Sequence, residues 1–261
     1  MDINGKVLGE GSFAVVYESK NKEYAIKVED NGYNSLLRNE AKIMKKMSEK
    51  DKEGKFVIPI YEYKEEKNFN KLVMKKMKMS LVDIKDIVDR FDNYSIKCII
   101  KSLIRSLNFV HLFGICHGDI KPENVMLSED YKKIYLIDFG LSKVYKIGGE
   151  HIINKKNCNY SGTLRFMSKN VNNGDKMSRR DDLISLGYMC IYLQKGELPW
   201  QGIYEVKKNI RYERIGKIKK DVDLDKLCEG CVNGIRDYMG YVYNLGFDEN
   251  PDYRKLLDFF K

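Results

Sequence analysis

Two glycines separate a pair of β-prone runs near the N-terminus, and this arrangement limits the possible folds more strongly than any other feature of the chain. The runs cover residues 7–10 and 14–18, and Gly9 and Gly11 lie at their junction. Glycines at such a junction let the backbone approach a ligand closely and present N–H donors to phosphate oxygens. A strand follows the loop where a dinucleotide-binding fold requires a helix, which excludes that fold. A simple hairpin turn is the alternative interpretation.

The pattern of apolar residues changes from short strands to long helices along the chain. A small strand-rich lobe is therefore expected to precede a larger helical lobe, with a boundary near residues 75–80. A cleft between two lobes is a preferred ligand site. Strands are expected at residues 24–28, 57–63, 72–77, 125–127 and 133–137, and helices at residues 34–47, 94–112 and 183–193.

A lysine and a glutamate in the strand-rich part are expected to form an ion pair. Glu40 shares one face of its expected helix with Leu36, Ile43 and Met47. A carboxylate on an apolar face costs free energy unless it is paired. Lys27, on the neighbouring expected strand, is the natural partner, and the pair would hold an ammonium group over the phosphates of a nucleotide. An ordinary salt bridge is the alternative.

Four polar residues surround an expected hairpin in the middle of the chain. Asn124 precedes its first strand and Asp138 follows its second, so both lie at the open end of the hairpin. Amide and carboxylate oxygens suit Mg²⁺. Asp119 lies upstream, where it can meet a substrate hydroxyl, and Lys121 can neutralise a transferred phosphoryl group. Each short motif alone predicts only a turn, but their order behind the glycine loop and the lysine–glutamate pair indicates phosphate chemistry.

With these motifs in this order, the chain resembles a eukaryotic protein kinase. Within that superfamily it is similar to the casein kinase I group, and it shares the glycine of His117-Gly118-Asp119 with the related vaccinia-related kinases. The resemblance extends from residue 7 to residue 259. Its group-specific part lies in residues 161–166, 178–187, 198–202, 212–215 and 247–253.

The resemblance implies an α+β, bilobal protein kinase fold with ATP in the cleft. It implies a small, mainly antiparallel β lobe with one helix and the hinge at residues 1–77, and a larger, mainly α-helical lobe at residues 78–261. Lys27 would bind the α- and β-phosphates, Met74 would be the gatekeeper, and residues 75–77 would form the hinge. The residues implied in ATP binding are Leu8, Gly9, Glu10, Gly11, Ser12, Phe13, Ala14, Val15, Val16, Lys27, Glu40, Met74, Lys75 and Met77.

The resemblance also implies catalytic roles in the helical part. Asp119 would orient the substrate hydroxyl and accept its proton, and Lys121 would contact the γ-phosphate. Asn124 and Asp138 would hold Mg²⁺, because a loose, anionic transition state needs mainly positioning and charge neutralisation. Asp182 would anchor the catalytic loop, with a simple helix N-cap as the alternative. The run from Lys121 to Asn124 resembles Ser/Thr kinases, so the expected substrates are serine and threonine hydroxyls of proteins.

Casein kinase I enzymes favour acidic or already phosphorylated substrates. Arg165 and Lys208 match positions that bind an anion in that family, and two cations can hold a phosphate through charge-assisted hydrogen bonds. A further basic position of the family's anion site is Cys158 here. The resemblance therefore predicts an anion pocket for the substrate, with two ordinary surface charges as the alternative.

Two positions depart from the usual kinase motifs, and they bear on whether and how the chain is active. Gly118 replaces the arginine that is common in kinases activated by phosphorylation of the activation loop, so we expect activity without that modification. Ala14 replaces the third glycine of the loop. Together they support a pseudokinase, a scaffold that binds nucleotide without catalysis, as the alternative to an active enzyme.

The chain carries a formal net charge of +9, which suits an acidic partner. The charge is spread along the chain, so nucleic-acid binding is the weaker alternative. Without a long apolar run or a signal peptide we expect no membrane association, and the unpaired cysteines favour the cytoplasm or the nucleus. We expect a monomer. Since the chain ends just after the last expected helix, we also expect no long regulatory tail.

Overall fold

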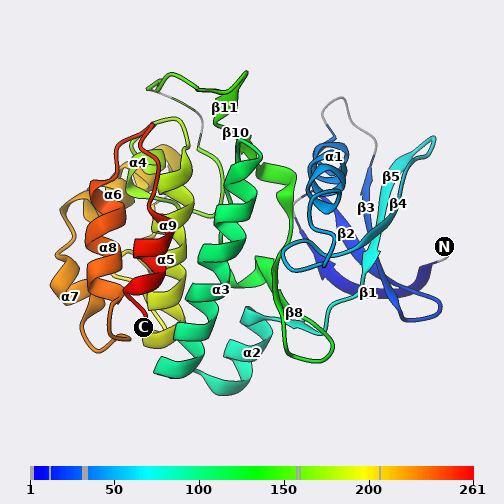
Figure 1. Cartoon of the computed structure of the whole chain (residues 1–261), viewed down its shortest axis with the longest axis horizontal. Coiled ribbons are helices and arrows are strands. Elements are labelled where there is room, and N and C mark those ends of the chain that lie inside the picture. The colour runs from blue at the N-terminus through cyan, green and yellow to red at the C-terminus, as the bar shows by residue number, and fades with distance from the viewer. Residues whose placement is uncertain (1–2, 12, 31–34, 157, 159, 206) are drawn as a thin grey trace. The chain divides into compact units, whose positions relative to one another are not determined.

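The computed structural model describes residues 3–11, 13–30, 35–156, 158, 160–205 and 207–261 (Figure 1). The chain divides into two compact units. Unit 1 consists of Met1–Met79 and Met126–Gly140, and unit 2 of Ser80–Val125 and Leu141–Lys261. Most strands belong to unit 1 and nearly all helices belong to unit 2, so the expected α+β fold with a strand-rich and a helical part is confirmed.

Unit 1 is built on a five-stranded sheet in which every neighbouring pair is antiparallel. The expected strand at residues 24–28 is present in full. In spatial order the strands are β1 (Ile3–Glu10), β2 (Val15–Ser19), β3 (Tyr24–Asp30), β5 (Phe69–Lys75) and β4 (Ile60–Glu65). β3 and β5, which lie inside the sheet, carry most of its buried residues, whereas residues 5–10 of β1 are exposed.

The strand expected at residues 57–63 begins later, as β4. Pro59 lacks the N–H that a sheet ladder uses. Before it, the carboxylate of Asp51 accepts hydrogen bonds from the backbone N–H groups of Phe56 (2.7 Å) and Val57 (2.9 Å). These N–H groups are therefore satisfied by a side chain, and the ladder starts only beyond the proline.

The helix of unit 1, α1 (Leu36–Ser48), begins where the hydroxyl of Ser35 accepts the N–H of Arg38 at 2.9 Å. The expected apolar face of this helix is only partly right. Leu36 and Ile43 are half-buried, and the buried face is rotated by about one residue. It consists of Leu37, Glu40, Ala41, Met44 and Met47.

The expected hairpin in the middle of the chain is present. β8 (Val125–Leu127) and β9 (Ile134–Leu136) pair with each other, and the N–H of Ser128 donates to the carbonyl of Lys133 at 2.9 Å. The 3-10 turns η1 (Pro122–Asn124) and η2 (Phe139–Leu141) flank this hairpin, and β6 (Met79–Ser80) completes its small sheet.

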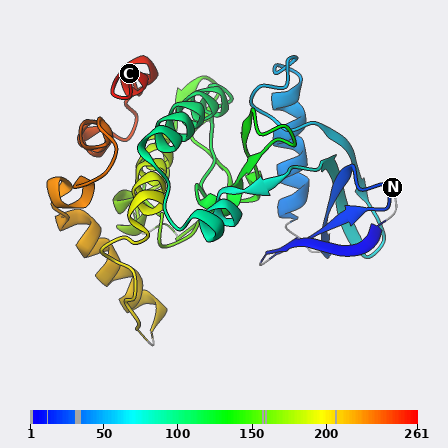
Figure 2. The same cartoon turned by 90° about the horizontal axis from the view of Figure 1, so that it is seen from below.

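Unit 2 is organised around α5 (Arg179–Lys195), whose residues are buried on nearly every side. It lies between α3 (Asn93–Leu112) and α8 (Ile235–Asn244), as Figures 1 and 2 show. The remaining helices are α2 (Leu81–Val88), α4 (Lys169–Asn172), α6 (Lys208–Asp221), α7 (Leu224–Cys228) and α9 (Tyr253–Asp258). The short strands are β7 (Ile115–Cys116), β10 (Lys143–Val144), β11 (Lys146–Ile147) and β12 (Glu150–His151).

Among the helices that the structure describes, none combines the length and the apolar character that a membrane crossing would need.

Candidate active site

The glycine loop of unit 1 is a turn between β1 and β2. Glu10 pairs with Val15, and the N–H of Gly11 donates to the carbonyl of Ala14 at 2.9 Å. A Cβ placed on Gly9 would meet no atom within 4 Å, so the backbone there is open to its surroundings. Ser12 lies outside the described residues. The other residues expected to bind ATP here are Leu8 and Phe13, both exposed, and Val16, half-buried on β2.

The expected ion pair between β3 and α1 is present. The Nζ of Lys27 lies 2.6 Å from Oε2 of Glu40 and 2.8 Å from Oδ1 of Asp138. The N–H of Phe139 donates to the other oxygen of Glu40 at 3.3 Å. Burial on its own lowers the pKa of Lys27, but the charges of Glu40 and Asp138 outweigh it, so that pKa lies above its usual value. Three segments of unit 1 therefore converge on one ammonium group.

The expected gatekeeper, Met74, and the expected hinge residues Lys75 and Met77 lie at the end of β5 and just beyond it. Met74 and Met77 are buried, and Lys75 is exposed. The N–H of Lys75 donates to the carbonyl of Pro59 at 2.9 Å. The backbone of this segment is thus held by unit 1 itself.

In unit 2 the carboxylate of Asp119 is nearly buried and has partners on both oxygens. Oδ2 lies 2.6 Å from Nζ of Lys121, and Oδ1 accepts the N–H and the hydroxyl of Thr163, both at 2.8 Å. The amide of Asn124 donates to the backbone carbonyl of Asp119 at 2.9 Å. The structure therefore brings the expected residues Asp119, Lys121 and Asn124 together. Thr163 was missed, although it lies in a segment that carried the family resemblance.

Asp182, on α5, holds the backbone that precedes Asp119. Its carboxylate accepts the N–H groups of His117 (2.7 Å) and Gly118 (2.9 Å) and lies 2.9 Å from Nε2 of His111. The capping box of α5 is made by Asp181 instead, so Asp182 anchors the loop and is not the cap. Burial opposes the charge of Asp182, but His111 and the loop N–H groups outweigh it, so the pKa of Asp182 lies below its usual value.

Two glycines allow the segment around Thr163 to approach the loop of Asp119. Gly118 and Gly162 have φ angles of +85° and +94°, in the region that favours glycine. A Cβ on Gly162 would lie 2.4 Å from the carbonyl oxygen of Gly118, and a Cβ on Gly118 would lie 2.9 Å from that of Leu141. The hydrogen bonds between Thr163 and Asp119 therefore depend on this close backbone contact.

The expected anion pocket stays a prediction. Arg165 is exposed, with its guanidinium 5.0 Å from the centre of the Tyr192 ring. Lys208 is the first residue of α6, and its side chain lies outside the described part of the structure. Cys158 is half-buried.

Comparisons with known proteins identify a family, and the similar proteins include two casein kinase I homologues. The model of the family described as "Protein kinase domain" matches residues 3–236. The chain is 35% identical over 271 aligned residues to casein kinase I homolog 1 and 36% identical over 269 to casein kinase I homolog 3, both from Schizosaccharomyces pombe. These alignments cover 98% of this chain and 59% and 60% of the two relatives. The chain thus spans about three fifths of the length of the curated relatives it matches.

Proposed function

Because this chain belongs to the protein kinase family, with similarity to casein kinase I homologues as the motifs predicted, we propose that it transfers the γ-phosphoryl group of ATP to serine and threonine hydroxyls of proteins. One observation carries the proposal. Asp119 is held in unit 2 with an ammonium group on one oxygen and the Thr163 hydroxyl and N–H on the other. A buried carboxylate built into such a network can accept a proton in a fixed direction.

In unit 1, Lys27 is the proposed ligand of the α- and β-phosphates. Glu40 fixes its ammonium group by a bond of 2.6 Å, and the glycine loop supplies N–H donors above the phosphates. Met74, Lys75 and Met77 are proposed to contact the adenine. Lys27 keeps its positive charge because two carboxylates lie within 2.8 Å of its nitrogen.

The donors that could hold Mg²⁺ are oxygens, which is the set that this ion prefers. Asp138 in unit 1 has a partly exposed carboxylate, and Asn124 in unit 2 uses its amide nitrogen for Asp119, which leaves its amide oxygen as the ligand atom. When bound, the ion would neutralise charge on the phosphates. Asp119 would meanwhile orient the hydroxyl and take its proton, and Lys121 would neutralise the transferred group.

We further propose that the enzyme prefers acidic or phosphorylated protein substrates through Arg165 and Lys208. The proposal rests on the family positions of these residues and on the positive net charge. Activity without phosphorylation of the activation loop is also proposed. Its support is that Gly118 offers no cation to a phosphate, while Asp182 already holds the loop.

A phosphate-incorporation assay tests the reaction. Phosphatase-treated wild type with Mg²⁺ and ATP should phosphorylate casein, and Asp119→Asn should reduce kcat by about 10²–10⁴-fold, the range of a lost general base. Asp86→Asn, an exposed aspartate on α2, is the matched control and should retain the wild-type rate. Equal incorporation by wild type and Asp119→Asn would refute the assigned base. Nucleotide binding without incorporation by wild type would support the pseudokinase alternative.

A further inference from the structure

A second carboxylate of β3 ties this strand to the beginning of α1. Glu29 is only 7% exposed. Its Oε1 accepts the backbone N–H groups of Leu36 (2.9 Å) and Leu37 (3.2 Å). Its Oε2 accepts the Ser35 hydroxyl and, at 3.5 Å, the amide of Asn70, the residue directly opposite it on β5. The N–H groups of the first turn of α1 are thus accepted by two side chains, the hydroxyl of Ser35 and the carboxylate of Glu29.

The contact between Glu29 and the start of α1 and the ion pair between Lys27 and Glu40 have the same spacing along the strand and along the helix. Lys27 and Glu29 are two residues apart on a strand, so they project to the same face about 6.6 Å apart. Leu36 and Glu40 are four residues apart on a helix, which is a rise of about 6 Å on one side. Strand and helix run in opposite directions. The distance between Lys27 and Glu29 on the strand therefore equals, within about 1 Å, the rise between Glu40 and Leu36 on the helix, so both contacts can form at once.

We propose that Glu29 is a positioning residue that fixes α1 on β3 and thereby keeps the Lys27–Glu40 pair formed. The catalytic consequence rests on the proposed kinase function. In protein kinases this pair must be in place for phosphoryl transfer, and the position of the helix is a point of control. Here a buried carboxylate occupies the N-terminus of the helix, where a negative charge is favourable.

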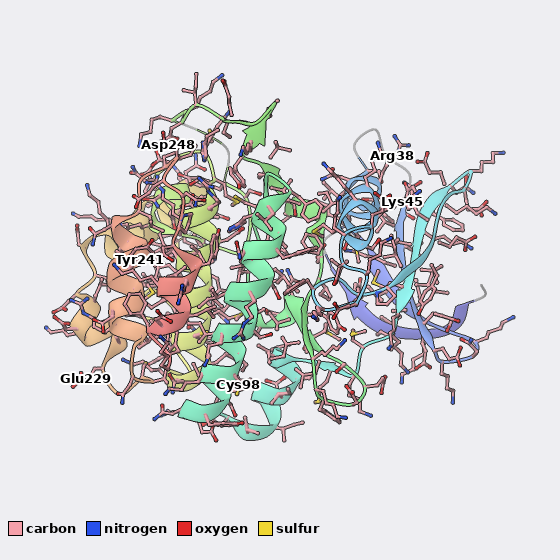
Figure 3. All side chains as sticks on the ribbon, in the orientation of Figure 1. Arg38, Lys45, Cys98, Glu229, Tyr241 and Asp248 are labelled. Carbon is pink, nitrogen blue, oxygen red and sulfur yellow. The ribbon has the colours of Figure 1, made fainter. Side chains whose placement is uncertain are left out.

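A second carboxylate bonded to the same helix offers a matched control. Glu65, at the end of β4, accepts two hydrogen bonds from Arg38 of α1, at 2.8 and 2.7 Å. Arg38 is labelled in Figure 3, and both side chains of the pair are about half exposed. Exposed ion pairs contribute little to stability or position. Glu65→Gln therefore removes a strand-to-helix contact of the same chemistry without removing the buried attachment.

The first experiment compares Glu29→Gln with Glu65→Gln. Hydrogen exchange of the Leu36 and Leu37 amides should become at least about tenfold faster in Glu29→Gln, because hydrogen bonds to a charged group are the stronger ones. It should stay unchanged in Glu65→Gln. In the phosphate-incorporation assay, kcat should fall about tenfold in Glu29→Gln with an unchanged KM for the protein substrate, and Glu65→Gln should match wild type. Unchanged exchange in Glu29→Gln would overturn the proposal.

A double-mutant cycle separates positioning from a general loss of structure. If Glu29 acts through Glu40, Glu29→Gln should change kcat less than about twofold in a Glu40→Gln background. If the reductions of kcat in the two single variants multiplied in the double variant, the positioning role would be overturned. Thermal melting checks that each variant is folded. If wild type transfers no phosphate, the proposed function fails, but the exchange rates of the two amides still decide whether Glu29 fixes the helix.

Discussion

Lys219 is a lysine with no exposed surface, and we expect its removal to destabilise unit 2 strongly. It lies on α6, and its Nζ donates to the carbonyls of Leu164 (2.7 Å) and Met167 (2.7 Å) and to Oδ1 of Asn172 (3.2 Å). Three oxygens thus surround this buried nitrogen. All three oxygens belong to the segment that follows Thr163.

Lys219→Met keeps a side chain of similar length and removes the nitrogen that contacts all three oxygens. Each buried acceptor that loses its partner costs about 1–3 kcal/mol. Part of this cost is offset because the buried amine itself is removed. We therefore expect the free energy of unfolding to fall by about 3 kcal/mol, and the melting temperature to fall by about 6–12 °C for a chain of this size.

Denaturant unfolding measures this loss through the single tryptophan of the chain. Trp200 is buried, and its ring centre lies 5.2 Å from Nζ of Lys219, so its fluorescence reports on this region. Lys220→Met, at the exposed neighbouring position, is the control and should unfold at the same denaturant concentration as wild type. Equal midpoints for Lys219→Met and Lys220→Met would refute the reasoning.

The pH dependence gives a second test of the same side chain. Burial lowers the pKa of Lys219 well below its usual value of 10.5. The unfolded chain then binds the proton more tightly than the folded one, so the wild-type free energy of unfolding should rise with pH up to about 10.5. Lys219→Met should lack this rise, so its deficit relative to wild type should grow as the pH approaches about 10.5.

Three further outcomes follow from the contacts of unit 2. Gly162→Ala should lower kcat for phosphate incorporation about a hundredfold, because its Cβ would press on the carbonyl of Gly118 and displace the segment; a wild-type rate would contradict this. Thr163→Val, which keeps the N–H but not the hydroxyl bonded to Asp119, should lower kcat about tenfold, and Thr163→Ser should restore it. Asp182→Asn should lower the free energy of unfolding. Because the folded pKa of Asp182 lies below its usual value of 3.8, that loss should be complete at pH 7 and should shrink as the pH falls below about 3.8, as denaturant titrations at pH 7 and pH 3 can measure.

Structural features that produce a recognisable pattern of neighbouring residues could be predicted from the sequence. The helix expected at residues 94–112 is α3 almost to the residue, because its apolar period continues for five turns. The Lys27–Glu40 pair was predictable because a carboxylate on an apolar helix face needs a partner. No single motif indicated phosphate chemistry. Only the order of the motifs along the chain did.

Features that depend on distant backbone groups could not be predicted. Glu29 finds its partners among backbone N–H groups of the next element, and a backbone N–H carries no sequence signal. Lys219 stands in a lysine-rich run between Lys217 and Lys220, which reads as a solvated surface, and only the packing of α6 buries one of them. The late start of β4 depends in part on Asp51, whose carboxylate accepts the N–H groups of Phe56 and Val57, although Pro59 was a local signal for it.

Two of the buried carboxylates that accept backbone N–H groups, Glu29 and Asp182, support the proposal that activity needs no phosphorylation of the activation loop. Glu29 fixes the first turn of α1 in unit 1, and Asp182 fixes the backbone of His117 and Gly118 in unit 2. A phosphate added during activation acts in the same way, by supplying a negative charge that accepts hydrogen bonds and orders a segment. When the anion is already part of the folded chain, the ordering needs no modification. Under the proposal of activity without activation-loop phosphorylation, the missing arginine at position 118 should not lower activity, because Asp182 already fixes the backbone of that position.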